Sequence, residues 1–302
     1  MNEKKNILII KHGAFGDLIQ AEGIFKSIRK HHKGANLVLL TSEKFYHLMK
    51  KCPSINQIIF DNRPSFIKIW FYIILYKRIN SYNFSIIYDL QNSQRTHIYR
   101  KFLFCKTKWI STDRKNHHIS GLMGLSDMLQ ENSIDNKYAM HPEISWLSGD
   151  VENLLSKNKI FSKYIVLLPG SSRKNMLKRW PYYRKLTMTL ILKGYEVLTI
   201  LGPEELDLEK STPGHVFKDL DWSQLAGLIE KSFFVVGNDS GPCHIASCLN
   251  KDGIAIFGNS TSASRSELKR EKFDTLEVDN LNNLTVECIM SKINKLTSSL
   301  KK

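Results

Sequence analysis

Residues 11–17, Lys-His-Gly-Ala-Phe-Gly-Asp, place a cation, two glycines and a carboxylate directly after the apolar run at residues 7–10. Glycine lets a backbone turn sharply and approach a ligand at the carboxyl edge of a parallel sheet. Asp17 is either a helix cap or a carboxylate that takes a proton from a hydroxyl. The third glycine of GxGxxG is absent, so the segment is not a dinucleotide fingerprint. A turn without a ligand remains the alternative.

A second candidate segment, residues 168–181, carries small hydroxyl side chains on a glycine turn and then four cations before Pro181. Backbone N–H groups and the hydroxyls of Ser171 and Ser172 could donate to a phosphate while Lys178 neutralises its charge. The pattern GxxxxGK[ST] is missing, so this is not a P-loop. The segment is read as a phosphate cradle, with a solvated basic loop as the alternative.

The third candidate segment, residues 236–246, reads Val-Gly-Asn-Asp-Ser-Gly-Pro-Cys-His-Ile-Ala. An acid and a hydroxyl precede a helix predicted to begin at Pro242, so unbonded amides and the positive helix end would face a ligand. An anion or a sugar would suit that end. Asp239 taken alone could be a structural cap. Three loops of this kind, all following apolar runs, are hard to obtain from packing needs alone.

The elements that position these loops are predicted from short apolar runs that alternate with helical-period segments. Runs that are apolar throughout are typical of buried parallel strands. In the first half the predicted strands are residues 7–10, 37–40, 57–60, 85–88 and 108–110, with a helix over 18–32. In the second half they are residues 164–168, 195–201, 233–236 and 253–257, with helices near 182–192, 223–230, 242–249 and 284–300. Two Rossmann-like halves follow from this order.

Length and charge agree with two domains. The chain has 302 residues, about two domains at the usual size, and the polar stretch at residues 150–162 predicts the boundary. We expect domains at residues 1–155 and 156–302. The net charge is +15, and residues 1–150 hold 22 basic against 12 acidic residues. Such an excess suggests a polyanionic partner: nucleic acid, an acidic membrane surface or a phosphorylated substrate.

The five cysteines are scattered without a CxxC pair, which favours neither a disulfide framework nor a zinc site. A reducing compartment fits best. The apolar run near the N-terminus is too short for a signal-peptide core, so a cytoplasmic location is expected. Asp219-Leu220-Asp221 spells DxD, a metal-chelating pair in one class of sugar transferases, but Asp221 to Gln224 is better read as a capping box that opens a helix.

Residues 66–79 are strongly apolar but too short to span a bilayer, and they carry charges. The favoured interpretation is a crossover helix buried against the sheet. The alternative is an interfacial helix whose aromatic side chains, with Lys68, Lys77 and Arg78, rest on an anionic membrane.

Together the three loops resemble the ADP-heptose:lipopolysaccharide heptosyltransferases, glycosyltransferase family 9. The family's GD pair, its GS followed by KxWP, and its DSGPxHxA block are matched by Gly16-Asp17, by Gly170-Ser171 with residues 178–181, and by residues 239–246. The matches span residues 7 to about 260. The resemblance implies an α/β chain of GT-B fold, two Rossmann-like doubly wound domains facing a central cleft. The first would be the acceptor side, and the second would bind the nucleotide-sugar.

The resemblance also implies roles for residues. Asp17 would be the general base, and Lys178 would stabilise the departing diphosphate in place of a metal ion. Asp239 would bind hydroxyls of the donor sugar, and amides around Ser240 would hold the diphosphate. The donor-binding set is Gly16, Ser171, Ser172, Asp239, Ser240, Gly241, Pro242 and His244, and His12 and Gly13 lie in the acceptor-side loop. No metal and no other cofactor is expected.

The sequence departs from the family at residues 258–262, where Gly-Pro-Thr is usual, and at His12 and Phe15. These changes leave the donor and the acceptor open. The expected function is an inverting, metal-independent transferase that moves heptose or a related sugar, ADP-heptose being the leading donor, to a lipopolysaccharide-core or other cell-envelope glycan. The expected partners are that donor, an anionic glycolipid or oligosaccharide acceptor, and the cytoplasmic face of the inner membrane through residues 66–79, without nucleic acid. The alternatives are an inactive nucleotide-sugar-binding protein and a basic nucleic-acid-binding protein.

Overall fold

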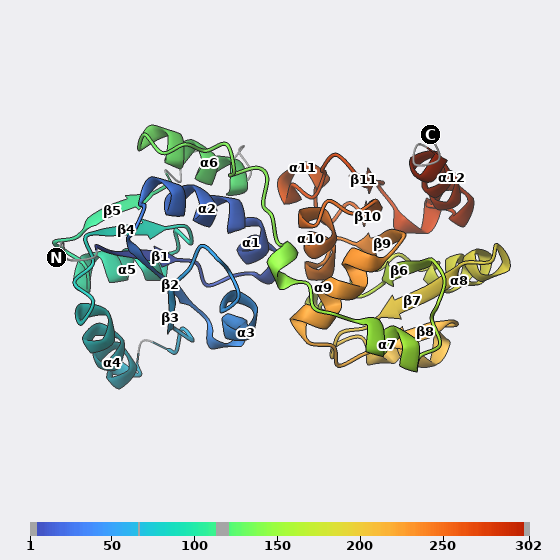
Figure 1. Ribbon diagram of the computed structural model, residues 1–302, viewed down its shortest axis with the longest axis horizontal. Helices are drawn as coiled ribbons and strands as arrows, with labels where there is room; N and C mark the ends of the chain where they lie inside the picture. Colours follow the sequence, from blue (N-terminus) through green and yellow to red (C-terminus); the bar gives the residue numbers. More distant parts are fainter. Residues whose placement is uncertain (1–4, 66, 113–120, 299–302) are drawn as a thin grey trace. The chain divides into compact units, whose positions relative to one another are not determined.

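The chain forms two compact units, residues 1–146 and 147–302, in a computed structural model that describes residues 5–65, 67–112 and 121–298 (Figure 1). The division falls earlier in the chain than the boundary expected between residues 155 and 156. Leu147 and Val151 are buried, and the N–H of Gly149 donates to the carbonyl of Ser223 at 3.0 Å. The segment that leads into the second half therefore packs within the second unit.

The first unit is built on a five-stranded parallel sheet of order β3-β2-β1-β4-β5. All five strands were predicted from their apolar runs, and the prediction is confirmed. The central strands are buried on both faces, as continuous apolar runs require. The strands are β1 (Asn6–Ile10), β2 (Asn36–Thr41), β3 (Gln57–Phe60), β4 (Ile86–Asp89) and β5 (Lys108–Ser111).

Helices cover both faces of this sheet (Figure 1). Two helices, α1 and α2, occupy the segment predicted as one helix. On the opposite face, side chains of α4 and α5 pack on alternate residues of the strands. The α-helices are α1 (Phe15–Gln20), α2 (Glu22–His31), α3 (Tyr46–Met49), α4 (Ile69–Asn80), α5 (Gln94–Phe102) and α6 (Gly121–Glu131), and a short 3₁₀ turn, η1 (Glu43–Phe45), precedes α3.

The prediction that residues 66–79 form a helix buried against the sheet is wrong, because most of α4 is exposed. Only Leu75 and Ile79 of this helix are buried, whereas Trp70 is 77% exposed and Ile74 is 62% exposed. The segment is apolar around its whole circumference, so periodicity could not tell which face packs. Phe66 lies outside the described residues. Among the helices that the structure describes, none has both the length and the hydrophobicity needed to cross a bilayer.

The second unit holds a six-stranded parallel sheet of order β11-β10-β9-β6-β7-β8. The four predicted strands are β6 (Tyr164–Leu168), β7 (Glu196–Ile200), β9 (Phe234–Asn238) and β10 (Gly253–Phe257). Two strands were not predicted, β8 (His215–Phe217) and β11 (Phe273–Glu277). Both lie at the sheet edges and carry polar residues, so neither shows the apolar run of a central strand.

Helices α8 and α12 pack on one face of the second sheet, and α9 and α10 contact each other elsewhere in the unit. The predicted capping box is confirmed, because the Asp221 carboxylate accepts from the N–H groups of Ser223 and Gln224, each at 2.8 Å. The α-helices are α7 (Glu152–Lys157), α8 (Tyr183–Leu192), α9 (Trp222–Lys231), α10 (Gly241–Cys248), α11 (Ala263–Ser266) and α12 (Val286–Ser298). The 3₁₀ segments are η2 (Ser145–Leu147), which crosses the division between the units, η3 (Arg173–Lys178), η4 (Leu206–Ser211) and η5 (Leu281–Asn283).

Candidate active site

Lys178 and Asp239 form an ion pair at the carboxyl edge of the second sheet, with 2.6 Å between Nζ and Oδ2. Lys178 follows β6 through η3, and Asp239 follows β9 directly. The two strands are neighbours, so their following loops meet. The two side chains keep 17% and 11% of their surface exposed, which leaves both accessible to a small ligand. The sequence predicted each residue for the donor site without predicting that they pair.

Asn238, the last residue of β9, ties these loops together. Its side chain is fully buried: Nδ2 donates to the carbonyl of Pro169 at 2.6 Å, and Oδ1 accepts from the Trp180 N–H and the Tyr183 hydroxyl. Trp180 is anchored in turn through Nε1 to the carbonyl of Leu284 at 2.9 Å. Sequence reasoning missed Asn238, although an amide at the end of an apolar strand was a usable signal.

The two serines predicted for the phosphate cradle hold the loop in shape. Ser171 is buried and its Oγ donates to the carbonyl of Asn175 at 3.0 Å, while Asn175 Nδ2 donates to Ser172 Oγ. Only Ser172 of this pair is exposed. The hydroxyl of Ser171 is thus engaged within the loop, and a ligand could be bound by Ser171 only through its backbone or after that hydroxyl turns away from Asn175.

Gly170 lies against the carboxyl group of Glu205, which sequence reasoning missed. A Cβ at residue 170 would lie 1.8 Å from the Glu205 carboxyl carbon, so any larger residue would require the Glu205 side chain to move. Burial raises the pKa of Glu205, and its Oε2 accepts from the Gly202 N–H at 2.8 Å. Arg179, also missed, binds the carbonyl of Ser171 at 3.2 Å and pairs with Asp207 at 3.0 Å.

The third predicted segment forms the start of α10. Ser240 is the N-cap and makes no side-chain cap hydrogen bond, and Pro242 lies in the first turn. A helix start of this kind directs N–H groups and the positive end of the helix dipole toward an anion. Gly241 and His244 are partly exposed on the same turn. The structure thus brings Lys178, Asp239 and residues 240–244 to one edge of the sheet.

Asp17 lies in the first unit, in the first turn of α1, and is exposed. Its Oδ2 accepts from the N–H of Ala14 at 3.2 Å, so the carboxylate does cap the helix. The contact is long, and the side chain remains open to solvent. The capping role and the general-base role are therefore compatible.

Glycine is required in the loop before Asp17. Gly13 has φ of +121°, and a Cβ there would lie 2.8 Å from the ring of Phe45. Gly16, predicted among the donor-binding residues, is buried within α1 of this first unit. The contact between Gly13 and Phe45 therefore packs the loop at residues 11–14 against η1.

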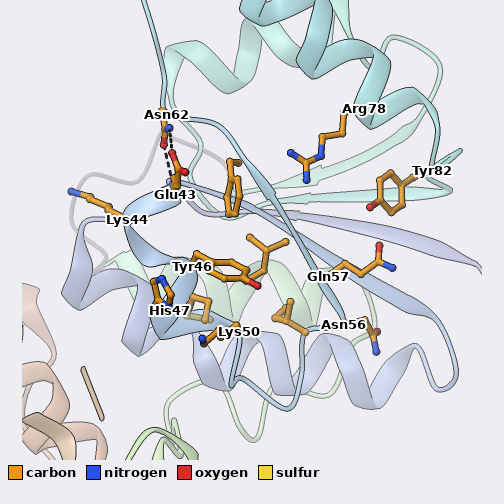
Figure 2. A pocket seen from close by; sticks show the side chains of 14 residues that line it. Glu43, Lys44, Tyr46, His47, Lys50, Asn56, Gln57, Asn62, Arg78 and Tyr82 are labelled. Carbon is orange, nitrogen blue, oxygen red and sulfur yellow. Dashed lines mark hydrogen bonds between the residues drawn. The ribbon is translucent and has the colours of Figure 1, made fainter. Parts of the chain in front are cut away.

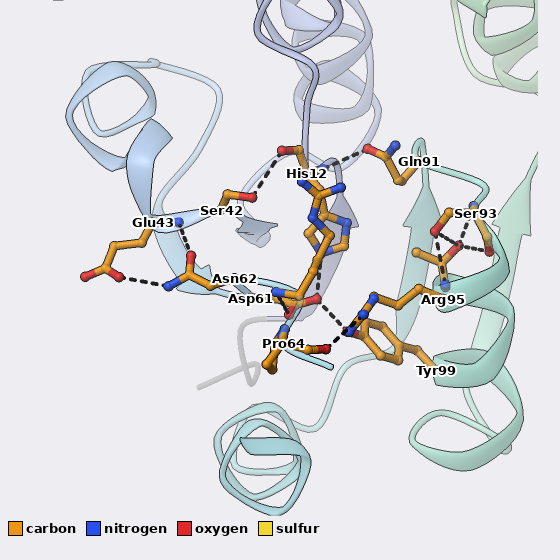
Figure 3. Close-up of polar contacts among 12 residues, drawn as sticks. His12, Ser42, Glu43, Asp61, Asn62, Pro64, Gln91, Ser93, Arg95 and Tyr99 are labelled. Carbon is orange, nitrogen blue, oxygen red and sulfur yellow. Dashed lines mark hydrogen bonds and ion pairs between the residues drawn. The ribbon is translucent and has the colours of Figure 1, made fainter. Parts of the chain in front are cut away.

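His12 was predicted in the acceptor-side loop, but its ring is fully buried beneath that loop (Figure 3). Nε2 lies 2.8 Å from Asp61 Oδ2, and the hydroxyl of Tyr99 donates to the same oxygen at 2.6 Å. Burial pushes the pKa of Asp61 upward, but the hydrogen bonds from His12, Tyr99 and the Arg63 N–H prevail and hold it below its usual value. The side chain of His12 therefore supports the loop from inside.

Lys11 is a buried cation that sequence reasoning did not assign. Its Nζ donates to the carbonyl of Leu90 at 3.3 Å. Burial lowers the pKa of the Lys11 ammonium, and the negative charges of Asp17 and Asp89 oppose part of that effect.

Each unit thus offers one kind of chemistry. The first presents an exposed carboxylate with a buried cation nearby, which suits removal of a proton from a hydroxyl. The second presents a cation, an acid and a helix start, which suit a sugar diphosphate. Among the residues that the structure describes, no group of three or more His, Cys, Asp or Glu side chains could hold a metal ion.

Comparison with known proteins points to one family. Residues 99–293, more than half of the chain, match the model of glycosyltransferase family 9 (heptosyltransferase). Lipopolysaccharide heptosyltransferase 1 of Campylobacter coli is 27% identical over 296 residues, which cover 85% of this chain and 84% of that protein.

Two solved structures share the fold. The family 9 glycosyl transferase of Veillonella parvula superposes with a TM-score of 0.82 at 17% identity, over 98% of this chain and 97% of that one. The Escherichia coli ADP-heptose lps heptosyltransferase II superposes with a TM-score of 0.77 at 16% identity, over 98% and 100%. The two parallel sheets of this α/β chain match the GT-B fold of those heptosyltransferases. The chain belongs to glycosyltransferase family 9, and it is a glycosyltransferase.

Proposed function

We propose that this protein is an inverting, metal-independent transferase that moves heptose from ADP-heptose to a sugar hydroxyl of the lipopolysaccharide core. The observation that carries the proposal is the Lys178–Asp239 pair at the start of α10, which forms a site suited to a sugar diphosphate. The relatives named for lipopolysaccharide and for ADP-heptose support the choice of acceptor and donor.

In the proposed reaction, Asp17 removes the proton from the acceptor hydroxyl as its oxygen attacks the anomeric carbon. The bond between that carbon and the diphosphate oxygen breaks, and ADP leaves with the bonding electrons. Attack from the face opposite the leaving group inverts the configuration through an oxocarbenium-like state. The proton stays on Asp17 until solvent takes it.

The leaving diphosphate gains negative charge, and Lys178 with the N–H groups at the start of α10 would stabilise it. These protein groups supply the positive charge that a metal ion supplies in other transferases, so we propose that neither a metal nor another cofactor takes part. Asp239 would accept hydrogen bonds from hydroxyls of the donor sugar. Its present bond to Lys178 keeps the ammonium at the place where the diphosphate would lie.

We propose in addition that the enzyme contacts the cytoplasmic face of the inner membrane through residues 67–79. The exposed apolar side chains of α4, together with Lys68, Lys77 and Arg78, support this contact. An apolar surface flanked by cations binds anionic bilayers. It would keep the enzyme close to a lipid-anchored acceptor.

The first test supplies the purified protein with ADP-heptose and deacylated lipopolysaccharide core. We expect transfer, with the new linkage opposite in configuration to the donor by NMR. Asp17→Asn should lower kcat by about 10²- to 10⁴-fold with donor affinity unchanged, since general-base catalysis contributes that much. The control Asp135→Asn changes an exposed carboxylate of the same unit and should leave the rate unchanged.

Full activity of Asp17→Asn would disprove the base assignment. Binding of ADP-heptose by the wild-type protein without transfer to any acceptor would instead favour an inactive nucleotide-sugar-binding protein. Nucleic-acid binding has only the net charge in its favour, and membership of a transferase family argues against it.

A further inference from the structure

A groove of about 1050 Å³ runs along β3, the edge strand of the first sheet (Figure 2). η1 and α3 lie along one side, and Arg78 of α4 with Tyr82, which follows α4, lies on the other (Figure 2). Residues of β3 form the floor. None of the proposed donor-site residues lines it.

The charges that line this groove are predominantly positive. Lys44 lies in η1, His47 in α3 and Lys50 directly after α3, and Arg78 reaches in from α4 (Figure 2). The one acidic side chain among the lining residues is Glu43, whose Oε2 accepts from Asn62 Nδ2 at 2.9 Å. A groove with three lysine or arginine cations against one occupied carboxylate favours an anionic ligand.

Aromatic rings and amides complete the groove. Tyr46 and Phe60 meet edge to face with 5.4 Å between ring centroids, and Tyr82 lies at the far end. Lys50 lies over the Tyr46 ring and Arg78 over the Phe60 ring, each 5.7 Å from the centroid. The rings place the cations beside flat apolar surfaces, a combination suited to a ligand with both charge and a carbon skeleton.

The groove adjoins the loop that holds Asp17. Phe45 belongs to η1 but does not line the groove. Its ring packs instead against Gly13, and its centroid lies 6.3 Å from that of the Phe15 ring. Asn62, on the rim, directly follows the buried Asp61 that supports His12. The segment η1 therefore lies between the groove and the loop that precedes Asp17.

We propose that this groove is a subsite for a phosphorylated saccharide portion of the acceptor, apart from the sugar that is glycosylated; the proposal rests on the proposed function. Lys50 and Arg78 bind the phosphate from opposite walls. The rings of Tyr46 and Phe60 contact the apolar face of the saccharide. The subsite sets acceptor affinity and takes no part in bond breaking.

The test measures binding without donor, by calorimetry on the full chain. The probe is a deacylated, phosphorylated lipopolysaccharide oligosaccharide, used before and after phosphatase treatment. We expect phosphate removal to weaken binding to the wild-type protein at least 10-fold. Lys50→Met with Arg78→Met keeps the aliphatic stems over the rings, and this double variant should bind both forms with equally low affinity. Lys33→Ala removes an exposed cation outside the groove and should behave as the wild type.

In turnover, the double variant should show a KM for acceptor raised at least 10-fold with kcat and donor KM within 2-fold of the wild type. Equal binding of both oligosaccharide forms by the wild type, or wild-type affinity of the folded double variant, would overturn the subsite. So would competition by glycerol phosphate, the soluble headgroup of phosphatidylglycerol, as strong as that of the oligosaccharide, which would assign the groove to phospholipid headgroups. Circular dichroism checks that the double variant is folded. If the double methionine variant does not fold, the double variant Lys50→Gln with Arg78→Gln is used in its place. If the wild-type protein binds the oligosaccharide in a phosphate-dependent way but transfers no sugar, the proposed function is wrong while the phosphate-binding subsite stands.

Discussion

Asn238, Trp180 and Lys178 show how single residues build the proposed donor site of this enzyme. The buried Asn238 amide holds the backbone at Pro169 and at Trp180, and Trp180 follows Lys178 by two residues. These bonds lie in a buried region, where an unsatisfied amide is costly. The ammonium of Lys178 is thus carried on a rigid support, which its proposed role at the diphosphate requires.

His32 is a second residue whose environment makes a measurable difference. Its Nε2 lies 2.7 Å from the Tyr88 hydroxyl. Burial, with the positive charges of His31, Lys5 and Lys108, lowers the pKa of His32 to about 4. An unfolded histidine titrates near pH 6.5. Between these values the unfolded chain binds a proton that the folded chain does not.

The pH dependence of stability follows from that difference. Stability from His32 is present above about pH 6.5 and is lost as the pH falls toward 4. The unfolding free energy, measured with urea, should therefore fall less between pH 7 and pH 4.5 for His32→Gln than for the wild type. The exposed His141→Gln is the control and should lose as much as the wild type. An identical loss in His32→Gln would contradict the prediction.

At the scale of elements, α4 is a helix whose composition and placement disagree. Its sequence is that of a core helix, yet most of its apolar side chains are exposed. On α5, Phe102 is 67% exposed as well. The contact between α4 and α5 is made by Tyr72 with Arg95 and Tyr99. These two helices give the first unit an exposed apolar surface.

Membrane binding by α4 can be measured by co-sedimentation with vesicles. The protein should bind vesicles that contain phosphatidylglycerol more than vesicles of phosphatidylcholine, and salt should weaken the binding because it screens the cations. Trp70→Glu with Ile74→Glu should reduce the bound fraction several-fold. Leu192→Glu, a change at an exposed apolar residue of α8, is the control. Unchanged binding by the double variant would assign the contact to another surface.

The edge strands show what periodicity cannot detect. β8 has three residues and β11 carries Asp274 and Glu277, so neither presents an apolar run. Central strands are apolar because both of their faces are covered, whereas an edge strand meets solvent. The predicted strands therefore include the whole of the first sheet and the middle of the second, and they omit both edges of the second sheet.

At the scale of the whole molecule, the two units divide the charge unevenly. Residues 1–146 carry 22 basic and 11 acidic residues, which favours an anionic partner for the first unit. The proposed phosphorylated acceptor and the anionic membrane surface would both complement that positive charge. The second unit holds the site suited to the nucleotide-sugar. The distribution of charge thus agrees with the proposal that the first unit binds the acceptor and the second binds the donor.

Nucleotide binding should stabilise the whole protein in a way that identifies the donor. ADP at 100 times its Kd should add about 2.7 kcal/mol to the stability of the form that binds it. We expect a rise in Tm with ADP, larger than with UDP, GDP or CDP, and equal in the presence of EDTA. Lys178→Ala should weaken ADP binding at least 10-fold, and Lys174→Ala, exposed in the same loop, should not. Loss of the shift in EDTA would contradict metal independence.

The sequence by itself determined the central strands, the two-unit α/β architecture and the three loops that carry the candidate site, because apolar runs and glycine-rich loop residues are local signals. It also determined the capping box at Asp221. Tertiary structure alone decided which loops meet. The order of strands brings Lys178 to Asp239, and hydrogen bonds among the residues that follow β1 and β3 and Tyr99 of α5 hold the buried His12 beside Asp61. It likewise decided that α4 is exposed and that a basic groove opens along β3, since both depend on contacts between segments far apart in the chain.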